Sequence, residues 1–246
     1  MSLRDELIEQ GEWLFRWRSY LPLLALLIVF LALQDLSHRL WNPLTDRSWE
    51  TVCFLVAVVG LLVRAYTVGT TPPGTSGRTT RKQVAESLNT TGMYSMVRHP
   101  LYLGNYLMWL GIALYPRSWE VLLLVSLIFW VYYERIMMAE EAFLEQRFGA
   151  EWKEWAARTP AFLPNPTLWR PSRHPFSLRK ALGQEFTGCF AVLVILASLE
   201  VTAMQILHDR WALDPAWAGL LMVSTVLYLA LRTLKRHTNL LDARPG

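Results

Sequence analysis

Long apolar runs, separated by short polar segments, make up most of this chain of 246 residues. A helix needs about 20 consecutive apolar residues to cross the hydrocarbon core of a membrane. The pattern therefore predicts an all-α integral membrane protein with about six transmembrane helices. The runs are Tyr20–Leu40, Trp49–Gly69, Leu101–Tyr115, Trp119–Met138, Phe186–Leu207 and Ala216–Leu234.

The third run is short, and it follows Pro100 directly. Proline is tolerated in the first turn of a helix, and it biases the residue before it, here His99, away from helical geometry. We therefore expect a helix to begin at Pro100 and to leave backbone N–H groups without partners at its start.

The runs divide the chain into three predicted parts. Residues 1–18 mix charges with leucine and tryptophan, a pattern typical of an amphipathic helix that lies on the inner membrane surface. Residues 19–165 are expected to form a membrane core of four spans and a cytoplasmic helix. Residues 166–246 add a C-terminal extension with two more spans.

Basic residues are distributed unevenly between the two sides of the membrane that this topology implies. Twenty of the 24 Lys and Arg residues fall on the side of the N-terminus, and the other four are Arg39, Arg47, Arg117 and Arg210. Because cytoplasmic loops are enriched in Lys and Arg, we predict that both ends are cytoplasmic. The bias explains the net charge of +4, and nucleic acid is not predicted as a partner.

Two polar clusters lie next to the membrane on that cytoplasmic side. One contains Tyr94, Arg98, His99 and Tyr102 around the start of the third run, and the other is Glu140–Glu141 at the end of the fourth. Charge at the end of a membrane span is costly unless it is paired or hydrated. Since the two runs form one helical hairpin, both clusters are expected to belong to one site. Taken singly, arginine and tyrosine are equally typical of membrane interfaces.

These residue types suit a particular ligand chemistry. A carboxylate such as Glu140 accepts hydrogen bonds from ribose hydroxyls or an amino group. A helix start beside Arg98 and His99 favours a carboxylate, and tyrosine rings offer faces to an adenine or a sulfonium. The sequence contains no closely spaced histidines, no Cys-x-x-Cys and no Gly-x-Ser-x-Gly, so neither a metal site nor a serine nucleophile is predicted.

The two clusters form a motif pair, Arg98-His99-Pro100-x-Tyr102-x-Gly104 and Glu140-Glu141-x-x-Leu144-x-x-x-Phe148-Gly149. The pair resembles the superfamily of isoprenylcysteine carboxyl methyltransferases and phospholipid methyltransferases, of which bacterial lipid A phosphate methyltransferases are similar members. The resemblance covers about residues 50–165. It implies an integral membrane enzyme that uses S-adenosylmethionine in a cytoplasm-facing pocket.

Carried over by position, the resemblance implies a cofactor pocket. It also identifies one position near this pocket at which the sequence differs from the isoprenylcysteine enzymes. The positions that match the pocket are Glu86, Ser87, Leu88, Asn89, Tyr94, His99, Pro100, Leu101, Tyr102 and Glu140. In the isoprenylcysteine enzymes an arginine four residues before the glutamate contacts the substrate carboxylate, and here that position is Ile136. This difference weakens the assignment of a prenylcysteine as the substrate, but it does not affect the prediction of methyl transfer.

The predicted acceptor is a membrane lipid headgroup, with catalytic roles for Arg98, Arg135 and Glu141. An anionic oxygen, of a phosphate or a carboxylate, needs a cation to orient it but no strong base, and Arg64 is a further candidate cation. N-methylation of phosphatidylethanolamine, with Glu134 or Glu141 as the base, and carboxyl methylation of a prenylcysteine are alternatives. A sterol or isoprenoid reductase with a reduced nicotinamide cofactor and a non-catalytic scaffold are alternatives of other classes.

Two further features are interpreted as structural. Phe148, Trp152 and Trp155 recur at helical spacing and are predicted to pack and to anchor the chain at the membrane interface. Glu200 in the fifth run is predicted to snorkel towards the outer surface.

Overall fold

The computed structural model describes residues 2–18, 20–38, 43–72 and 85–238. Within these ranges the regular elements are helices, and the pairing outside them is one isolated bridge between Gly92 and Arg170. The predicted all-α fold is confirmed. The helices are α1 (Leu3–Trp17), α2 (Ala25–Ala32), α3 (Pro43–Gly69), α4 (Met93–Met96), α5 (Pro100–Leu114), α6 (Trp119–Phe148), α7 (Ala150–Arg158), α8 (Leu178–His208) and α9 (Pro215–His237), with 3₁₀ segments Leu21–Leu24, Leu33–His38 and Pro166–Leu168.

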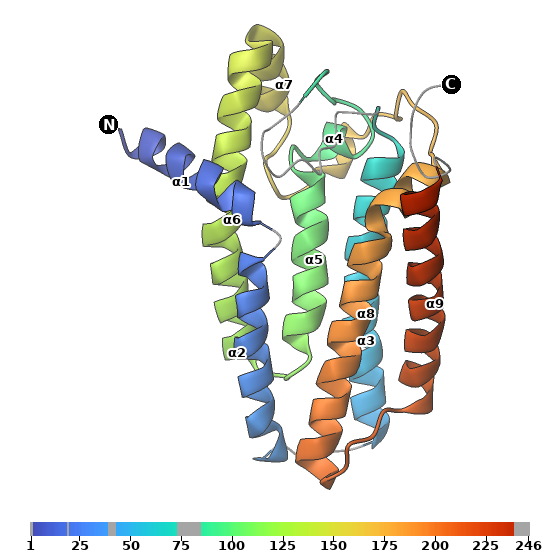
Figure 1. Ribbon diagram of the computed structural model, residues 1–246. Coiled ribbons are helices and arrows are strands. Elements are labelled where there is room, and N and C mark those ends of the chain that lie inside the picture. The colour runs from blue at the N-terminus through green and yellow to red at the C-terminus, as the bar shows by residue number, and fades with distance from the viewer. Residues whose placement is uncertain (1, 19, 39–42, 73–84, 239–246) are drawn as a thin grey trace.

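Helices α2, α3, α5, α6, α8 and α9 stand side by side as a bundle, and α1, α4 and α7 gather at one end of it (Figure 1). The C-terminal end of α9 lies at that same end, whereas the α5–α6 and α8–α9 connections lie at the opposite end (Figure 1). The exposed side chains of the bundle include many leucines, such as Leu27, Leu62, Leu127 and Leu229. An apolar outer surface of this kind is what a lipid environment requires.

Four helices, α3, α6, α8 and α9, are long and apolar enough to cross a membrane. A fifth crossing is counted if α1 and the segment Pro22–Asp35, which meet at an angle of 76°, form one bent span. Helix α5 has 15 residues, because it runs from Pro100 to just before Pro116, and the residue before a proline is disfavoured in a helix. All six apolar runs contain helix, but the count of six crossings stays a prediction.

Glycines let α3 and α5 approach each other closely. A Cβ added at Gly104 would lie 2.8 Å from the carbonyl oxygen of Gly60, and one added at Gly60 would lie 2.8 Å from the backbone nitrogen of Met108. Small residues at such positions allow the backbones of membrane helices to touch. The close contact fixes the start of α5 against the C-terminal half of α3.

The start of α5 is as the sequence predicts, with one correction. His99 caps the helix with a non-helical backbone (φ −120°, ψ 60°), and Pro100 is its first residue. The N–H groups just before the helix are not free, however, because Arg98 donates to the carbonyl of Pro160 (2.8 Å) and His99 to that of Ala161 (3.2 Å). The chain after α7 thus returns and pairs with the segment that leads into α5.

Helix α1 packs across α6. A side chain at Gly11 would overlap the backbone carbonyl of Arg135, and Arg4 forms an ion pair with Glu145 at 3.0 Å. Leu3 and Trp13 remain exposed on the helix. This agrees with the predicted amphipathic helix, while its position on the inner membrane surface stays a prediction.

The orientation of the bundle can be tested with reporter fusions. We expect an alkaline phosphatase fused after Arg170 to be inactive, because the basic residues place that end of the bundle in the cytoplasm, and one fused after Arg210 to be active. Phosphatase activity after Arg170 would contradict the topology. Five of the basic residues behind this prediction, Arg39, Arg78, Arg81, Lys82 and Arg244, lie outside the described residues.

Candidate active site

A cavity of about 580 Å³ opens at the end of the bundle where α1, α4 and α7 gather. Its walls come from the segment before α4, from α5 and α6, from α7 and from α8. A volume of this size matches the pockets that bind small molecules in proteins. The cavity has a polar part near the ends of α5 and α6 and an apolar part between α5 and α8.

His99 lies between the two acids at the polar end of the cavity. Its Nε2 is 2.9 Å from Oε1 of Glu141, and its Nδ1 is 3.6 Å from Oε2 of Glu140. The first contact is a hydrogen bond, and the second is a longer charge contact. The two motifs that are 40 residues apart in the sequence therefore meet in one cluster.

The two carboxylates change the acidity of His99. Desolvation by burial alone would lower the pKa of His99, but the nearby carboxylates of Glu140 and Glu141 outweigh this effect and raise it above its ordinary value. A protonated imidazole donates from both ring nitrogens, one towards each acid. Each acid therefore faces one ring nitrogen of His99, and the imidazole holds the two side chains in place.

Tyr102 orients Glu140 from the first turn of α5. Its hydroxyl donates to Oε1 of Glu140 at 2.7 Å, and its buried ring lies beside those of His99 and Tyr133, with centroid distances of 5.8 and 4.9 Å. Tyr94 lines the same part of the cavity, where burial raises the pKa of its hydroxyl. Neither ring occupies the membrane-interface position that a single tyrosine would suggest.

Arg98 connects α6 to α7. Its Nε lies 3.0 Å from Oε1 of Glu141, and its Nη1 donates to the backbone carbonyl of Ala156 at 2.9 Å. The side chain is 19% exposed, so it does not extend into solvent as a snorkelling arginine would. Arg98 therefore belongs to the cavity wall.

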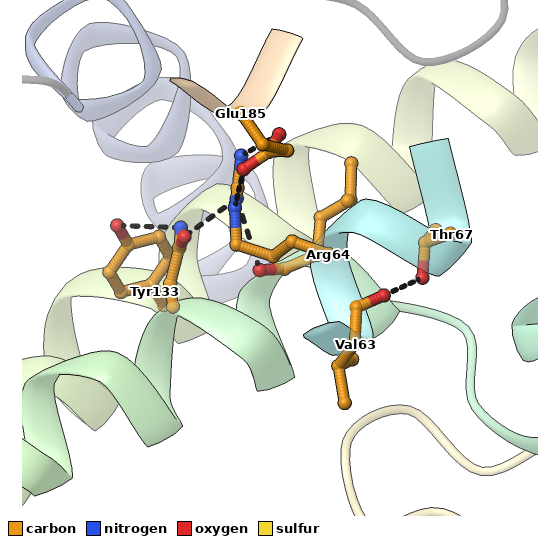
Figure 2. Close-up of polar contacts among 7 residues, drawn as sticks. Val63, Arg64, Thr67, Tyr133 and Glu185 are labelled. Carbon is orange, nitrogen blue, oxygen red and sulfur yellow. Dashed lines mark hydrogen bonds and ion pairs between the residues drawn. The ribbon is translucent and has the colours of Figure 1, made fainter. Parts of the chain in front are cut away.

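A second polar cluster lies where the polar and apolar parts of the cavity meet (Figure 2). The Nε and Nη2 of Arg64 on α3 donate to the two carboxylate oxygens of Glu185 on α8, each at 2.8 Å. Its Nη1 donates to Oδ1 of Asn105 at 2.6 Å, and the Asn105 amide donates to the Tyr133 hydroxyl at 3.3 Å. The bidentate pair joins α3 to α8, and the bonds through Asn105 and Tyr133 extend the cluster to α5 and α6.

The structure brings most of the predicted pocket residues together. Those that line the cavity are Ser87, Leu88, Asn89, Tyr94, His99, Pro100, Leu101, Tyr102, Glu140, Arg98 and Glu141. Glu86 is exposed and is not among the lining residues. Glu134 does not line the cavity either.

Arg135 lies outside the cavity. Its Nε donates to Gln10 on α1 at 2.9 Å and its Nη1 to the backbone carbonyl of Val131 at 2.6 Å. Ile136 is fully buried beside it in the apolar core. Successive helical residues differ by about 100° in direction, so Arg135 cannot take the place of an arginine at position 136.

Several lining residues were not predicted. Trp152 and Trp155 of α7 line the cavity, and Trp155 donates its indole N–H to the carbonyl of Tyr94 at 3.1 Å. The buried indole nitrogen of Trp152 has no hydrogen-bond partner among the described residues. The helical spacing of these aromatic residues is the sequence signal that could have indicated a cavity wall. Aromatic residues that anchor a helix at the membrane interface show the same spacing.

Glu200 differs from its predicted role. It is buried in α8 and accepts a hydrogen bond from the Tyr115 hydroxyl at 2.6 Å, so it does not snorkel.

Across the part of the chain that the structure covers, no three His, Cys, Asp or Glu side chains are grouped so as to hold a metal ion.

Comparison with known proteins gives a family for the central segment. Residues 49–151 match the family described as phospholipid methyltransferase. The resemblance inferred from the motif pair is confirmed over this segment, which contains α5, α6 and nearly all of α3.

Curated relatives share parts of the chain. A cobalt-zinc-cadmium resistance protein of Cupriavidus metallidurans is 40% identical over 84 residues, 34% of this chain and 38% of the relative. A nickel-cobalt-cadmium resistance protein of Alcaligenes xylosoxydans is 34% identical over 137 residues, 54% of this chain and 59% of the relative. A protein-S-isoprenylcysteine O-methyltransferase of Schizosaccharomyces pombe is 32% identical over 77 residues, 31% of this chain and 33% of the relative.

The chain therefore spans less than two thirds of the length of each of these three relatives. No solved structure matches the chain.

Proposed function

We propose that the protein is an S-adenosylmethionine-dependent methyltransferase that methylates an anionic oxygen, of a phosphate or a carboxylate, on a membrane lipid. The observation that carries the proposal is the cavity, which joins the His99–Glu140–Glu141 cluster to an apolar part between two membrane helices. A polar cofactor needs the polar part of such a cavity, and the hydrocarbon chain of a lipid acceptor needs the apolar part. The central family match and the name of the yeast relative support the same reaction class.

The polar part of the cavity fits the proposed cofactor. Glu140 offers carboxylate oxygens for an amino group or ribose hydroxyls, and Trp152 offers a buried N–H that lacks an acceptor among the described side chains and backbone. Aromatic faces at Tyr94 and Trp155 suit an adenine ring or a sulfonium. When bound, the cofactor would supply an electrophilic methyl group.

The residues of the chain would position the reactants. Tyr102 and His99 hold Glu140 in one orientation, so little has to reorganise when a ligand binds. Since methyl transfer is an in-line displacement, holding donor and acceptor at the correct distance supplies much of the rate.

The state of the carboxylates favours an acceptor that is already anionic. Glu140, Glu141 and Glu185 each accept a hydrogen bond or an ion pair from a neighbouring side chain. A base for an amine would first have to give up such a partner, whereas a phosphate or a carboxylate has no proton to lose. Arg98 and Arg64 supply positive charge at the cavity to orient it, and we assign Glu141 the role of holding Arg98 and His99.

The proposal extends to the location and organisation of the chain. We place the site on the cytoplasmic face of a bacterial inner membrane, in a core of residues 19–165 that is flanked by an interfacial helix and a two-helix extension.

The acceptor can be identified with purified full-length protein and labelled S-adenosylmethionine. Three acceptors would be offered in parallel: a lipid phosphate monoester, phosphatidylethanolamine and a prenylcysteine. We expect label in the phosphate monoester. Label only in the amine would favour N-methylation, label only in the prenylcysteine would favour carboxyl methylation, and label in none would contradict a lipid methyltransferase of these types.

A further inference from the structure

Helix α8 lies outside the segment that matches the family, yet it forms one wall of the cavity. Its lining residues are Glu185, Thr187, Gly188, Ala191, Val192 and Ile195. They face Asn105, Met108, Trp109 and Ile112 on α5, which also line the cavity. From Glu185 to Ile195 the wall changes from charged to apolar over about 15 Å of helix.

This wall is fixed to the core by two polar contacts. Near the start of α8, the buried ammonium of Lys180 donates to the carbonyls of Thr71 (2.6 Å) and Pro72 (3.0 Å), just beyond the end of α3. One to two turns later, Glu185 forms the bidentate pair with Arg64 (Figure 2). One contact is a buried ammonium that donates to backbone carbonyls and the other is an ion pair, and together they connect α8 to α3 at two levels.

Gly188 lines the cavity between Glu185 and the apolar residues of α8. A Cβ added there would lie 3.8 Å from Oε2 of Glu185 and 3.8 Å from Cε of Met108, which is ordinary van der Waals contact. A methyl group therefore fits, whereas a larger side chain would extend into the space between α8 and α5. The position lies one turn beyond Glu185, where the apolar part begins.

We propose that α8 is the wall that binds the hydrocarbon chain of the acceptor, and that Gly188 forms the passage through which this chain enters the apolar part. The inference rests on the proposed function and names the substrate class of the same site. The acceptor is then a lipid whose anionic headgroup lies at the level of Arg64 and whose hydrocarbon chain runs along Met108, Ile112 and Ile195. The C-terminal extension thus contributes one wall of the chain-binding part, opposite α5 of the family core.

The test is the binding of alkyl phosphates to full-length variants in detergent, measured by calorimetry without cofactor. Gly188→Leu fills the passage, Gly188→Ala adds one tolerated methyl, and Gly219→Leu on α9 is the matched control, since a Cβ there meets nothing within 4 Å. The two probes are ethyl phosphate and decyl phosphate. Relative to free probe in water, after correction for partition into the micelles, each methylene kept out of the apolar part should cost about fourfold in affinity.

We expect Gly188→Leu to reduce the preference for decyl over ethyl phosphate by at least about tenfold. In Gly188→Ala and Gly219→Leu this preference should be close to that of the unsubstituted protein. Equal preferences in Gly188→Leu and Gly219→Leu would overturn the inference, as would a loss of ethyl phosphate binding as large as that of decyl phosphate. If the preference for decyl phosphate depends on Gly188 but no acceptor receives label from S-adenosylmethionine, the proposed methyl transfer is wrong. The inference that α8 binds a hydrocarbon chain is then still supported.

Discussion

Glu185→Ala is expected to lower the free energy of unfolding by about 3–5 kcal/mol, because it leaves a largely buried guanidinium without its carboxylate. Arg64 is 18% exposed and Glu185 9%, and the two are joined by two hydrogen bonds of 2.8 Å. The amide oxygen of Asn105 would remain as a partner for Arg64, but it carries no charge. Thermal and denaturant unfolding of the full chain in detergent measures the loss.

A double variant separates the energy of the pair from the cost of breaking it. Arg64→Met with Glu185→Leu replaces both charges by apolar groups and should be much closer to the original stability than Glu185→Ala, since neither partner is left unpaired. Glu154→Ala is the surface control, because Glu154 pairs with Arg158 at an exposed site and such pairs contribute about 0.5 kcal/mol or less. Equal losses for Glu185→Ala and Glu154→Ala would show that α8 is not held by this ion pair.

The part of the site that could be predicted is the part encoded locally. Pro100 marks the start of α5 by its own geometry, and the motifs around His99 and Glu140 lie on one helical hairpin, so their meeting follows from a single turn. Ile136 likewise predicts that α6 has no arginine at the position where the isoprenylcysteine enzymes carry one. Each of these inferences depends on residues that are close in sequence or joined by one connection.

The part that could not be predicted depends on distant pairing. Glu185 is 121 residues from Arg64, and α8 carries no motif that marks it as a cavity wall. Trp152 reaches the cavity because the chain after α7 pairs with Arg98 and His99, a contact with no periodic signal.

S-adenosylmethionine should bind about ten- to a hundredfold more weakly to Glu140→Gln, because a hydrogen bond to a charged group contributes about 1.5–3 kcal/mol. The amide keeps the shape of the side chain and can still accept from Tyr102, so the cluster should retain its packing. His99→Ala should weaken binding to a similar extent, since it removes the imidazole that faces both acids and holds Glu140 in place. Calorimetry on full-length protein measures both affinities.

Two further variants show whether a loss of affinity comes from the cavity itself. Glu145→Gln changes an acid on the same helix that pairs with Arg4 and Lys153 and does not line the cavity, so it should leave cofactor affinity unchanged. Trp152→Phe removes the indole N–H together with part of the ring, and it should weaken binding by at least roughly fivefold, the value for one neutral hydrogen bond. An unchanged affinity in both Glu140→Gln and His99→Ala would place the cofactor elsewhere. Equal weakening by Glu140→Gln and Glu145→Gln would point to a general effect of charge on α6, because only the first of these acids reaches the cavity.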